Sequence, residues 1–284
     1  MYMNLCPGTV GISGLNFEQT VKLAVDHGFE GIDPPLDEMH RDGHVKRFVD
    51  RLRGAGLRWG SFGLPVEFRR DNEAFERTLA HLRKLAPIAE QAGVTRCSTW
   101  ILPGSNDLDF AANFERHRSR LTASAKVLAR CGIRLGLEFI GPKTLRDSFT
   151  HPFIYTLDGM LELADAVESG SGAQMGILLD VWHWYTSGGT TQDILENLPN
   201  EKIVLVHVND APAGRSRDEQ IDNERALPCE TGVIDAAGFV GCLRRVEYDG
   251  PITAEPFVPA LAKMPPDAVA AKVAASVRKF LSLA

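Results

Sequence analysis

The sequence lacks long apolar runs, paired cysteines and any excess of positive charge. No apolar stretch approaches the roughly 20 residues of a membrane-spanning helix, so no membrane partner is expected. The five cysteines are scattered and none form a C-x-x-C pair, which argues against zinc fingers and redox motifs. The first residues also lack the basic segment and apolar stretch of a secretory signal. A cytoplasmic protein with free thiols is therefore expected.

The charge and length of the chain narrow its class further. The formal net charge is −6, which is unfavourable for binding nucleic acid because phosphates attract a basic surface. Hydrophobic residues make up 44% of the 284 residues, enough for a large core. Because α/β barrels commonly contain about 250 residues in one unit, we expect a single domain over residues 1–284.

Apolar strand-like segments alternate along the chain with helix-like segments, many of which end at glycine. Strands are predicted at 5–10, 31–35, 57–66, 94–102, 134–140, 175–181, 203–208 and 251–255. Helices are predicted at 17–27, 45–55, 72–92, 110–131, 157–167, 193–198, 236–246 and 268–283. Strands joined through helices run parallel. Eight such units predict an α/β fold of the (β/α)8 TIM barrel type. An open doubly wound sheet is less favoured, because its glycine-rich phosphate-binding turn is missing.

Four consecutive predicted strands end in a residue that is able to bind a metal ion. These residues are Glu138, Asp180, His207 and Glu255. The carboxyl ends of barrel strands meet at one face, where active sites lie, and three carboxylates gathered there would repel one another without a cation. A single Glu or His at a strand end is more often structural, but four at equivalent positions favour a metal site. Oxygen-rich ligation suits Mn²⁺ best, with Mg²⁺, Co²⁺ or Zn²⁺ as alternatives.

Several motifs resemble those of a known family. They are Leu137-Glu138, Asp180-Val181-Trp182-His183, His207-Val208-Asn209-Asp210, Arg225 through Pro228 to Gly232, and Thr253-Ala254-Glu255-Pro256-Phe257. The chain resembles the xylose isomerase-like TIM barrel superfamily. Within it, the chain is similar to the sugar phosphate isomerase/epimerase group, which includes ketose 3-epimerases, inosose-processing enzymes and endonuclease IV. The resemblance implies that the four strand-end residues bind one divalent ion and that the protein is a dimer or tetramer.

The same resemblance implies contacts with a carbohydrate substrate. It implies that His183 meets a substrate oxygen beside the metal, as does an arginine of the loop after the seventh strand; we select Arg217, with Arg215 as the alternative. Trp100 and Trp182 stand near the predicted site, where a tryptophan is able to stack on a sugar ring, although packing is an equal alternative. Lys143 follows Glu138 closely enough to reach a substrate, although solvated charge is its default.

The expected function is that of a metal-dependent isomerase or epimerase acting on a sugar or sugar phosphate. Glu138 and Glu255 would flank the substrate carbon, one removing a proton and the other returning it, through a metal-stabilised enediolate. If the same intermediate expels a leaving group, the enzyme is instead a lyase or dehydratase acting on a keto-sugar, keto-inositol or keto-glycoside. The loop at Gly141–Arg146, which has Thr144 where ketose epimerases carry a second glutamate, favours this alternative.

Two further functions are less favoured by the sequence. A phosphodiesterase like endonuclease IV needs further histidines at the ends of the third and fourth strands. Those ends here read Ser61-Phe62-Gly63 and Ser98-Thr99-Trp100. A non-catalytic binding barrel is the remaining alternative, distinguished by whether the metal-loaded protein supports turnover.

Overall fold

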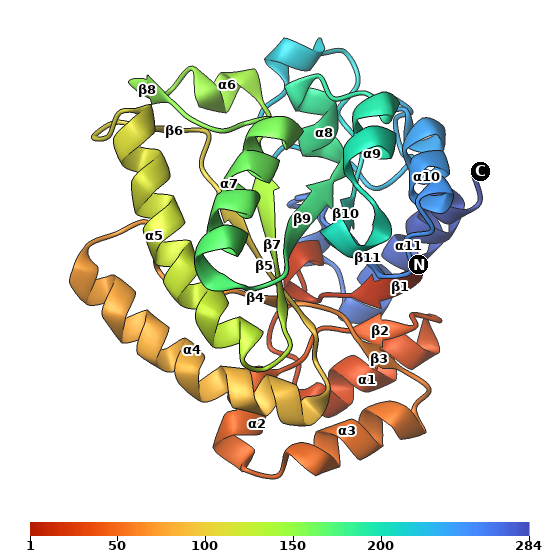
Figure 1. Ribbon diagram of the computed structural model, residues 1–284. Helices are drawn as coiled ribbons and strands as arrows, with labels where there is room; N and C mark the ends of the chain where they lie inside the picture. Colours follow the sequence, from red (N-terminus) through yellow and green to blue (C-terminus); the bar gives the residue numbers. More distant parts are fainter. Residues whose placement is uncertain (284) are drawn as a thin grey trace.

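Nine parallel strand segments form the central sheet of the protein (Figure 1). The computed structural model describes residues 1–283 of the chain. The segments lie in the order β3-β2-β1-β11-β10-β9-β7-β5-β4. Their bounds are β1 (Tyr2–Leu5), β2 (Gly31–Ile32), β3 (Arg58–Trp59), β4 (Phe62–Gly63), β5 (Arg96–Ile101), β7 (Arg134–Phe139), β9 (Met175–Asp180), β10 (Ile203–Val208) and β11 (Pro251–Ala254). Because the pairing is parallel throughout, all carboxyl ends point the same way.

The sheet closes on itself through β3 and β4, which stand at opposite ends of the strand order. Only Gly60 and Ser61 separate these two segments in the chain. They are therefore two parts of one barrel strand, which the sequence predicted at 57–66, and the two ends of the sheet meet there. The predicted (β/α)8 TIM barrel is confirmed.

Helices surround the barrel at the eight predicted places (Figure 1). They are α1 (Phe17–Asp26), α3 (Val45–Gly54), α4 (Asn72–Ala92), α5 (Phe110–Ala129), α7 (Leu157–Ser171), α9 (Thr191–Asn197), α10 (Ala236–Arg245) and α11 (Pro266–Leu281). The bounds of α4 agree with the prediction because its ends are well marked. The Asp71 carboxylate accepts the Ala74 amide at its start, and Gly93, with φ of 76°, ends it. Among residues 1–283, no helix has the length and apolar character needed to cross a membrane.

Two predictions from the sequence were wrong in detail. The first strand was expected at residues 5–10, but it ends at Leu5, and η1 (Gly8–Val10) follows as a 3-10 turn. Pro7 begins that turn and has no amide hydrogen to extend a strand. Helices α2 (Leu36–Asp42), α6 (Lys143–Arg146) and α8 (Val181–Ser187) were not predicted. Helix α8 starts directly after β9, so the residues that follow Asp180 are helical.

The loops at the carboxyl end of the barrel are linked to one another. An antiparallel pair joins β6 (Gly104–Ser105), which follows β5, to β8 (His151–Pro152), which follows β7 and the short helix α6 (Lys143–Arg146). The long loop after β10 contains η3 (Arg217–Glu219). Thr144 in α6 donates a hydrogen bond to the Gln220 carbonyl of that loop, at 2.7 Å. These loops therefore form a connected rim around the barrel mouth. Two further 3-10 turns, η2 (Asn200–Lys202) and η4 (Leu261–Lys263), complete the described elements.

The barrel interior is tightly packed around a glycine that lies beneath Glu138. Gly136 lies two residues earlier in β7, on the same face of the strand. A Cβ atom at this position would lie 2.9 Å from the Val204 Cβ and 3.1 Å from the Leu178 amide nitrogen. Neither a strand backbone nor a β-branched side chain yields easily to such a contact. The interior at this level therefore accepts no side chain at residue 136.

We expect Gly136→Ala to destabilise the protein by about 1–3 kcal/mol, because overpacking forces neighbouring strands apart. Urea denaturation followed by circular dichroism measures the change. Gly63→Ala is the matched control, because a Cβ atom on that strand glycine meets nothing within 4 Å. Equal stability of the two variants would contradict this account of the interior.

Candidate metal centre and adjoining cavity

The four predicted ligand residues meet at the carboxyl end of the barrel. They come from β7, β9, β10 and the residue directly after β11, which are neighbours in the sheet. His207 is in register with Asp180 on one side and with Thr253 on the other. One ligand atom from each of the four residues lies within 4.8 Å of those from the others. The sequence order of the strands therefore produces a compact group of one imidazole and three carboxylates.

The donor atoms of this group fit a divalent metal ion. His207 Nδ1 lies 3.4 Å from Glu255 Oε2 and 3.9 Å from both Glu138 Oε1 and Asp180 Oδ2. Within the described chain, the buried His207 Nδ1 and Glu138 Oε1 have no hydrogen-bond partner. Buried polar atoms without partners are costly. An ion with ligand distances of roughly 2.0–2.2 Å would satisfy both atoms at once, so the residues fit such an ion.

Asp180 is held in place by backbone and side-chain donors. Its Oδ1 accepts the amide of Trp182 at 2.7 Å, which caps the start of α8. The amide group of Asn209, two residues after His207, donates to Oδ1 at 3.2 Å and to Oδ2 at 3.3 Å. These bonds fix the carboxylate orientation, as partners of metal ligands commonly do.

Arg225 enters the same group of acids from the long loop after β10. Its Nη1 lies 2.8 Å from Asp180 Oδ2 and 3.0 Å from Glu255 Oε2, and the side chain is 1% exposed. Phe257, whose φ of 43° is unusual for a bulky residue, places its ring 4.5 Å from the guanidinium carbon. Trp182 packs on the guanidinium as well, at 4.8 Å. Arg225 is thus a buried cation among the acids of the site, with both Nη atoms engaged and Nε without a partner in the described chain.

His183 lies between the metal centre and the loop after β7. Its Nδ1 is 3.2 Å from the Gly141 amide nitrogen, and its Nε2 is 3.0 Å from Arg225 Nη2. Burial and the nearby charge of Arg225 lower the pKa of His183 to about 3. The ring is therefore neutral at physiological pH and is held in one orientation at the cavity wall.

The pKa values at the metal centre reflect burial competing with neighbouring charges. Burial raises the pKa of Glu138 well above its usual range, and the charge of Glu255 raises it further. Burial would also raise the pKa of Glu255, but His207 and Arg225 outweigh it and lower that pKa. Burial disfavours charged His207, yet Glu255 and the other acids raise its pKa to about 9. The acids thus draw positive charge toward the centre, which suits a site for a cation.

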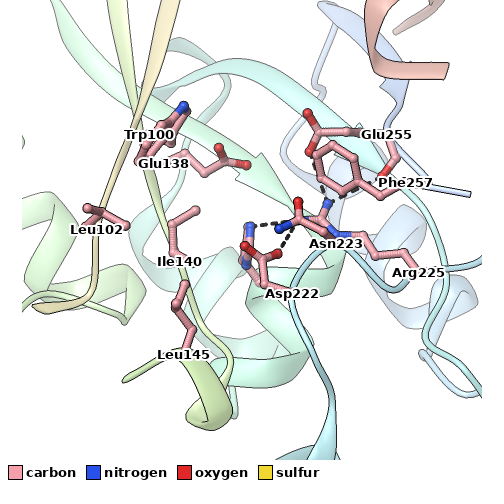
Figure 2. A pocket seen from close by; sticks show the side chains of 11 residues that line it. Trp100, Leu102, Glu138, Ile140, Leu145, Asp222, Asn223, Arg225, Glu255 and Phe257 are labelled. Atoms are coloured by element: carbon pink, nitrogen blue, oxygen red, sulfur yellow. Dashed lines mark hydrogen bonds and ion pairs between the residues drawn. The ribbon is translucent and has the colours of Figure 1, made fainter. Parts of the chain in front are cut away.

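A cavity of about 410 Å³ opens beside these residues, with Glu138 and Glu255 on opposite sides of it (Figure 2). Apolar side chains form much of its wall: Trp100, Leu102, Ile140, Leu145 and Phe257. Asp222, Asn223, Arg225 and His183 add polar groups. A cavity with apolar walls and a few convergent polar groups is typical of a site for a small molecule.

The predicted substrate residues divide into those at the cavity and those away from it. Trp100 and His183 line the cavity, and Trp100 stands in register with Glu138 on the neighbouring strand. Trp182 is fully buried and packs behind the site. Lys143 pairs with Asp147 at 2.7 Å on α6, and Arg217 lies in η3 beside Gly188. Neither of these two contributes to the cavity wall.

Arg217 was expected to reach the substrate, whereas Arg225, from the same loop, is the arginine that lines the cavity. A signal for Arg225 was present, because it begins the motif that leads through Pro228 to Gly232. What the pattern lacked was any indication that the loop folds back. Asp210 pairs with Ala226 as an isolated bridge, and this contact returns Arg225 to the barrel mouth.

Comparison with known proteins agrees with this fold. The model of the xylose isomerase-like TIM barrel family matches residues 21–280. The chain therefore belongs to the xylose isomerase-like TIM barrel family. None of the curated proteins compared with the chain matches it significantly.

Three solved structures show the fold over almost the full length of the chain. A xylose isomerase domain protein from Alicyclobacillus acidocaldarius subsp. acidocaldarius is 27% identical, with a TM-score of 0.83, and the match covers 99% of this chain and 98% of that one. The IOLI protein with a bound zinc atom is 16% identical, with a TM-score of 0.80 and the same coverage. D-Psicose 3-epimerase with D-tagatose, from Clostridium cellulolyticum H10, is 14% identical, with a TM-score of 0.73 and 99% coverage of both chains.

We expect His207→Ala to remove metal binding, because it deletes the one nitrogen ligand and leaves three buried acids. Titration with Mn²⁺ or Zn²⁺, followed by thermal unfolding, measures the effect. Bound metal should raise the melting temperature of the natural protein and should leave that of the variant unchanged. His81→Ala is the control, because His81 pairs with Asp37 on the surface. Equal metal stabilisation of both variants would remove His207 from the site.

Proposed function

We propose that the protein is a divalent-metal-dependent isomerase or epimerase of a sugar or sugar phosphate. The observation that carries this proposal is the pair Glu138 and Glu255, which face one cavity from opposite sides within a group suited to a metal ion. Two carboxyl groups on either side of a bound substrate are able to remove and return a proton. The epimerase among the similar structures supports a carbohydrate substrate.

Glu138, Asp180, His207 and Glu255 would hold the ion, with Mn²⁺ preferred because oxygen ligands predominate. When bound, such an ion supplies positive charge that polarises a substrate carbonyl and stabilises the negative charge formed as a proton leaves. The protein groups perform the proton transfer itself. One glutamate takes the proton from the carbon next to the carbonyl, and the other delivers a proton to the opposite face or to the adjacent carbon.

The remaining cavity residues orient the substrate and limit access of water. His183 and Arg225 present fixed polar groups at the wall next to Glu255. An arginine of the loop after β10, Arg217, was expected to contact a substrate oxygen; we propose Arg225 for this role, because Arg225 lines the cavity and Arg217 does not. Trp100 offers a flat apolar surface in register with Glu138, on which a sugar ring is able to stack. Ile140, Leu145 and Phe257 add apolar wall that reduces the space for water.

A lyase or dehydratase acting on a keto-sugar, keto-inositol or keto-glycoside is the second candidate. Thr144 stands where the resemblance leads one to expect a second glutamate, and its hydroxyl is used for a bond to Gln220. No acid from that position therefore reaches the substrate. A neighbouring cavity of about 250 Å³ shares Asn223 and Phe257 with the first. It offers space for a leaving group attached to the reacting sugar.

Incubation in deuterated water with Mn²⁺ and a panel of ketoses, keto-inositols and keto-glycosides tests the proposal. Deuterium at one stereocentre or at the adjacent carbon, without elimination, supports the isomerase or epimerase. Loss of water or of an aglycone identifies the lyase. Absence of any exchange in the metal-loaded protein would contradict both enzymatic functions and favour a non-catalytic binding barrel. The homo-oligomer and the cytoplasmic location stay predictions.

We expect Glu255→Gln to reduce the exchange rate by about 10²-fold or more, because a positioned base contributes roughly that much. Metal content, measured in the same samples, separates loss of the base from loss of the ion. Glu90→Gln, an exposed change on α4, serves as the control. Normal exchange in metal-loaded Glu255→Gln would exclude Glu255 as the base.

A further inference from the structure

The Arg69 guanidinium stacks on the ring of Trp100, and Trp100 lines the cavity. Arg69 belongs to the segment that follows β4, at the same end of the barrel as the metal centre. Its guanidinium carbon is 3.7 Å from the centre of the Trp100 ring and 4.1 Å from that of the Phe68 ring. Trp100 lines the cavity in register with Glu138 and is 44% exposed (Figure 2). Arg69 therefore packs on a side chain of the cavity wall without being a lining residue itself.

The charge of Arg69 has no acidic partner within the described chain. Its Nη2 donates to Thr99 Oγ1 at 3.3 Å and to the Trp100 carbonyl, while its Nε is buried without a partner. No carboxylate among residues 1–283 forms an ion pair with it. Glu67 is near enough to act through its charge, but its carboxylate accepts the Arg69 backbone amide instead. Burial lowers the pKa of Arg69 to about 10, so the side chain remains charged at neutral pH.

Two more arginines donate hydrogen bonds to backbone carbonyls of the same segment. Arg116 donates to the carbonyls of Arg69 and Arg70. Arg120 donates to the Phe68 carbonyl at 2.9 Å and also to the Arg70 carbonyl. Burial and the charge of Arg116 lower the pKa of Arg120. In the part of the chain that the structure describes, neither arginine forms an ion pair, although the charges of Asp71, Glu67 and Glu76 act on Arg120 and partly offset the lowering of its pKa.

Arg69 differs from the two neighbouring arginines in that its guanidinium stacks on a side chain of the cavity wall. The side chains of Arg69, Arg116 and Arg120 lie around one loop without ion pairs in the described chain, whereas Arg118, on the same helix as Arg116 and Arg120, pairs with Glu115. For Arg69, the unfavourable feature is a largely buried charge without an ion-pair partner, which an anion would compensate. A guanidinium matches the geometry of a carboxylate or a phosphate, with which it forms charge-assisted hydrogen bonds.

We propose that Arg69 is a specificity residue that recognises an anionic group, phosphate or carboxylate, on the substrate, at a distance from the reacting carbon. The inference rests on the proposed function, because it takes the cavity as the substrate site. The carbon chain of the substrate lies along Trp100, its carbonyl end faces Glu138 and Glu255, and its anionic end reaches Arg69. Arg116 and Arg120 position the loop and add positive charge behind it.

Binding, rather than turnover, gives the decisive test. The metal-loaded protein is titrated with fructose, fructose 6-phosphate and fructuronate, and the dissociation constants are measured by calorimetry. We expect at least one of the two anionic ligands to bind about tenfold tighter than fructose, as a charge-assisted hydrogen bond allows. The phosphate and carboxylate arms show which anion fits. Equal affinity for all three ligands would overturn the proposal.

Variants then assign the preference to Arg69. Arg69→Gln should bring the preferred anion to within about two- to threefold of fructose, and Arg70→Gln should leave the preference intact. Arg70 is the matched control because it is exposed and adjacent. Arg69→Lys keeps the charge and should retain part of the preference, which covers the case in which Arg69→Gln does not fold. If Arg69 only anchored its loop, Arg69→Gln would weaken the three ligands equally, and the proposal would be rejected.

The outcomes separate this inference from the proposed function. Preference for an anion that depends on Arg69, in a protein without proton exchange, would support the anion site and reject the isomerase. Exchange on neutral ketoses without any such preference would support the isomerase and reject the anion site.

Discussion

The site depends on one constraint, which is that acidic groups must stay close together where water is largely excluded. Glu138, Asp180 and Glu255 converge because parallel strands end at a common edge. Buried carboxylates repel one another and lose their hydration, so the arrangement requires positive charge nearby. Arg225 and His207 provide it within the protein. Through Arg225, the loop after β10 therefore compensates the charge of Asp180 and Glu255, and it also forms part of the rim of the barrel.

Arg225 connects groups that would otherwise act independently. Through Nη1 it touches Asp180 and Glu255, and through Nη2 it touches His183 and Asp222. Breaking one partner out of such a buried network generally costs about 3–5 kcal/mol, because a charge is left without compensation. The positions of the glutamate proposed as base and of the histidine proposed to bind substrate are therefore set by one side chain.

The barrel and the convergence of the four strand-end residues could be predicted from the sequence for a common physical reason. Glu138, Asp180, His207 and Glu255 each end an apolar run, and strands of a barrel deliver their ends to one place. The bounds of helix α4 could also be predicted, since Asp71 and Gly93 cap its two ends. At these places the local sequence pattern determines where the residue lies in the fold, so the pattern was sufficient to predict the position.

Loop positions were not predictable in the same way. Arg225 reaches the site because the loop after β10 folds back, and no periodic pattern records that turn. Helix α8 was missed because its seven residues are too short to show a clear helical period. The stack of Arg69 on Trp100 joins segments that follow different strands. Such contacts depend on tertiary structure, and sequence spacing contains no trace of them.

The pairing of β6 with β8 has a consequence for how the rim of the cavity is able to diversify. Through these backbone bonds, the loop that follows Trp100 and the loop that follows Glu138 share a border. The Gly104 Cβ position would fall 2.4 Å from the Phe149 Cβ, so the border admits no added bulk. An insertion that reshapes one loop would also displace the other. A change in the shape of the cavity rim would therefore require matched changes in both loops.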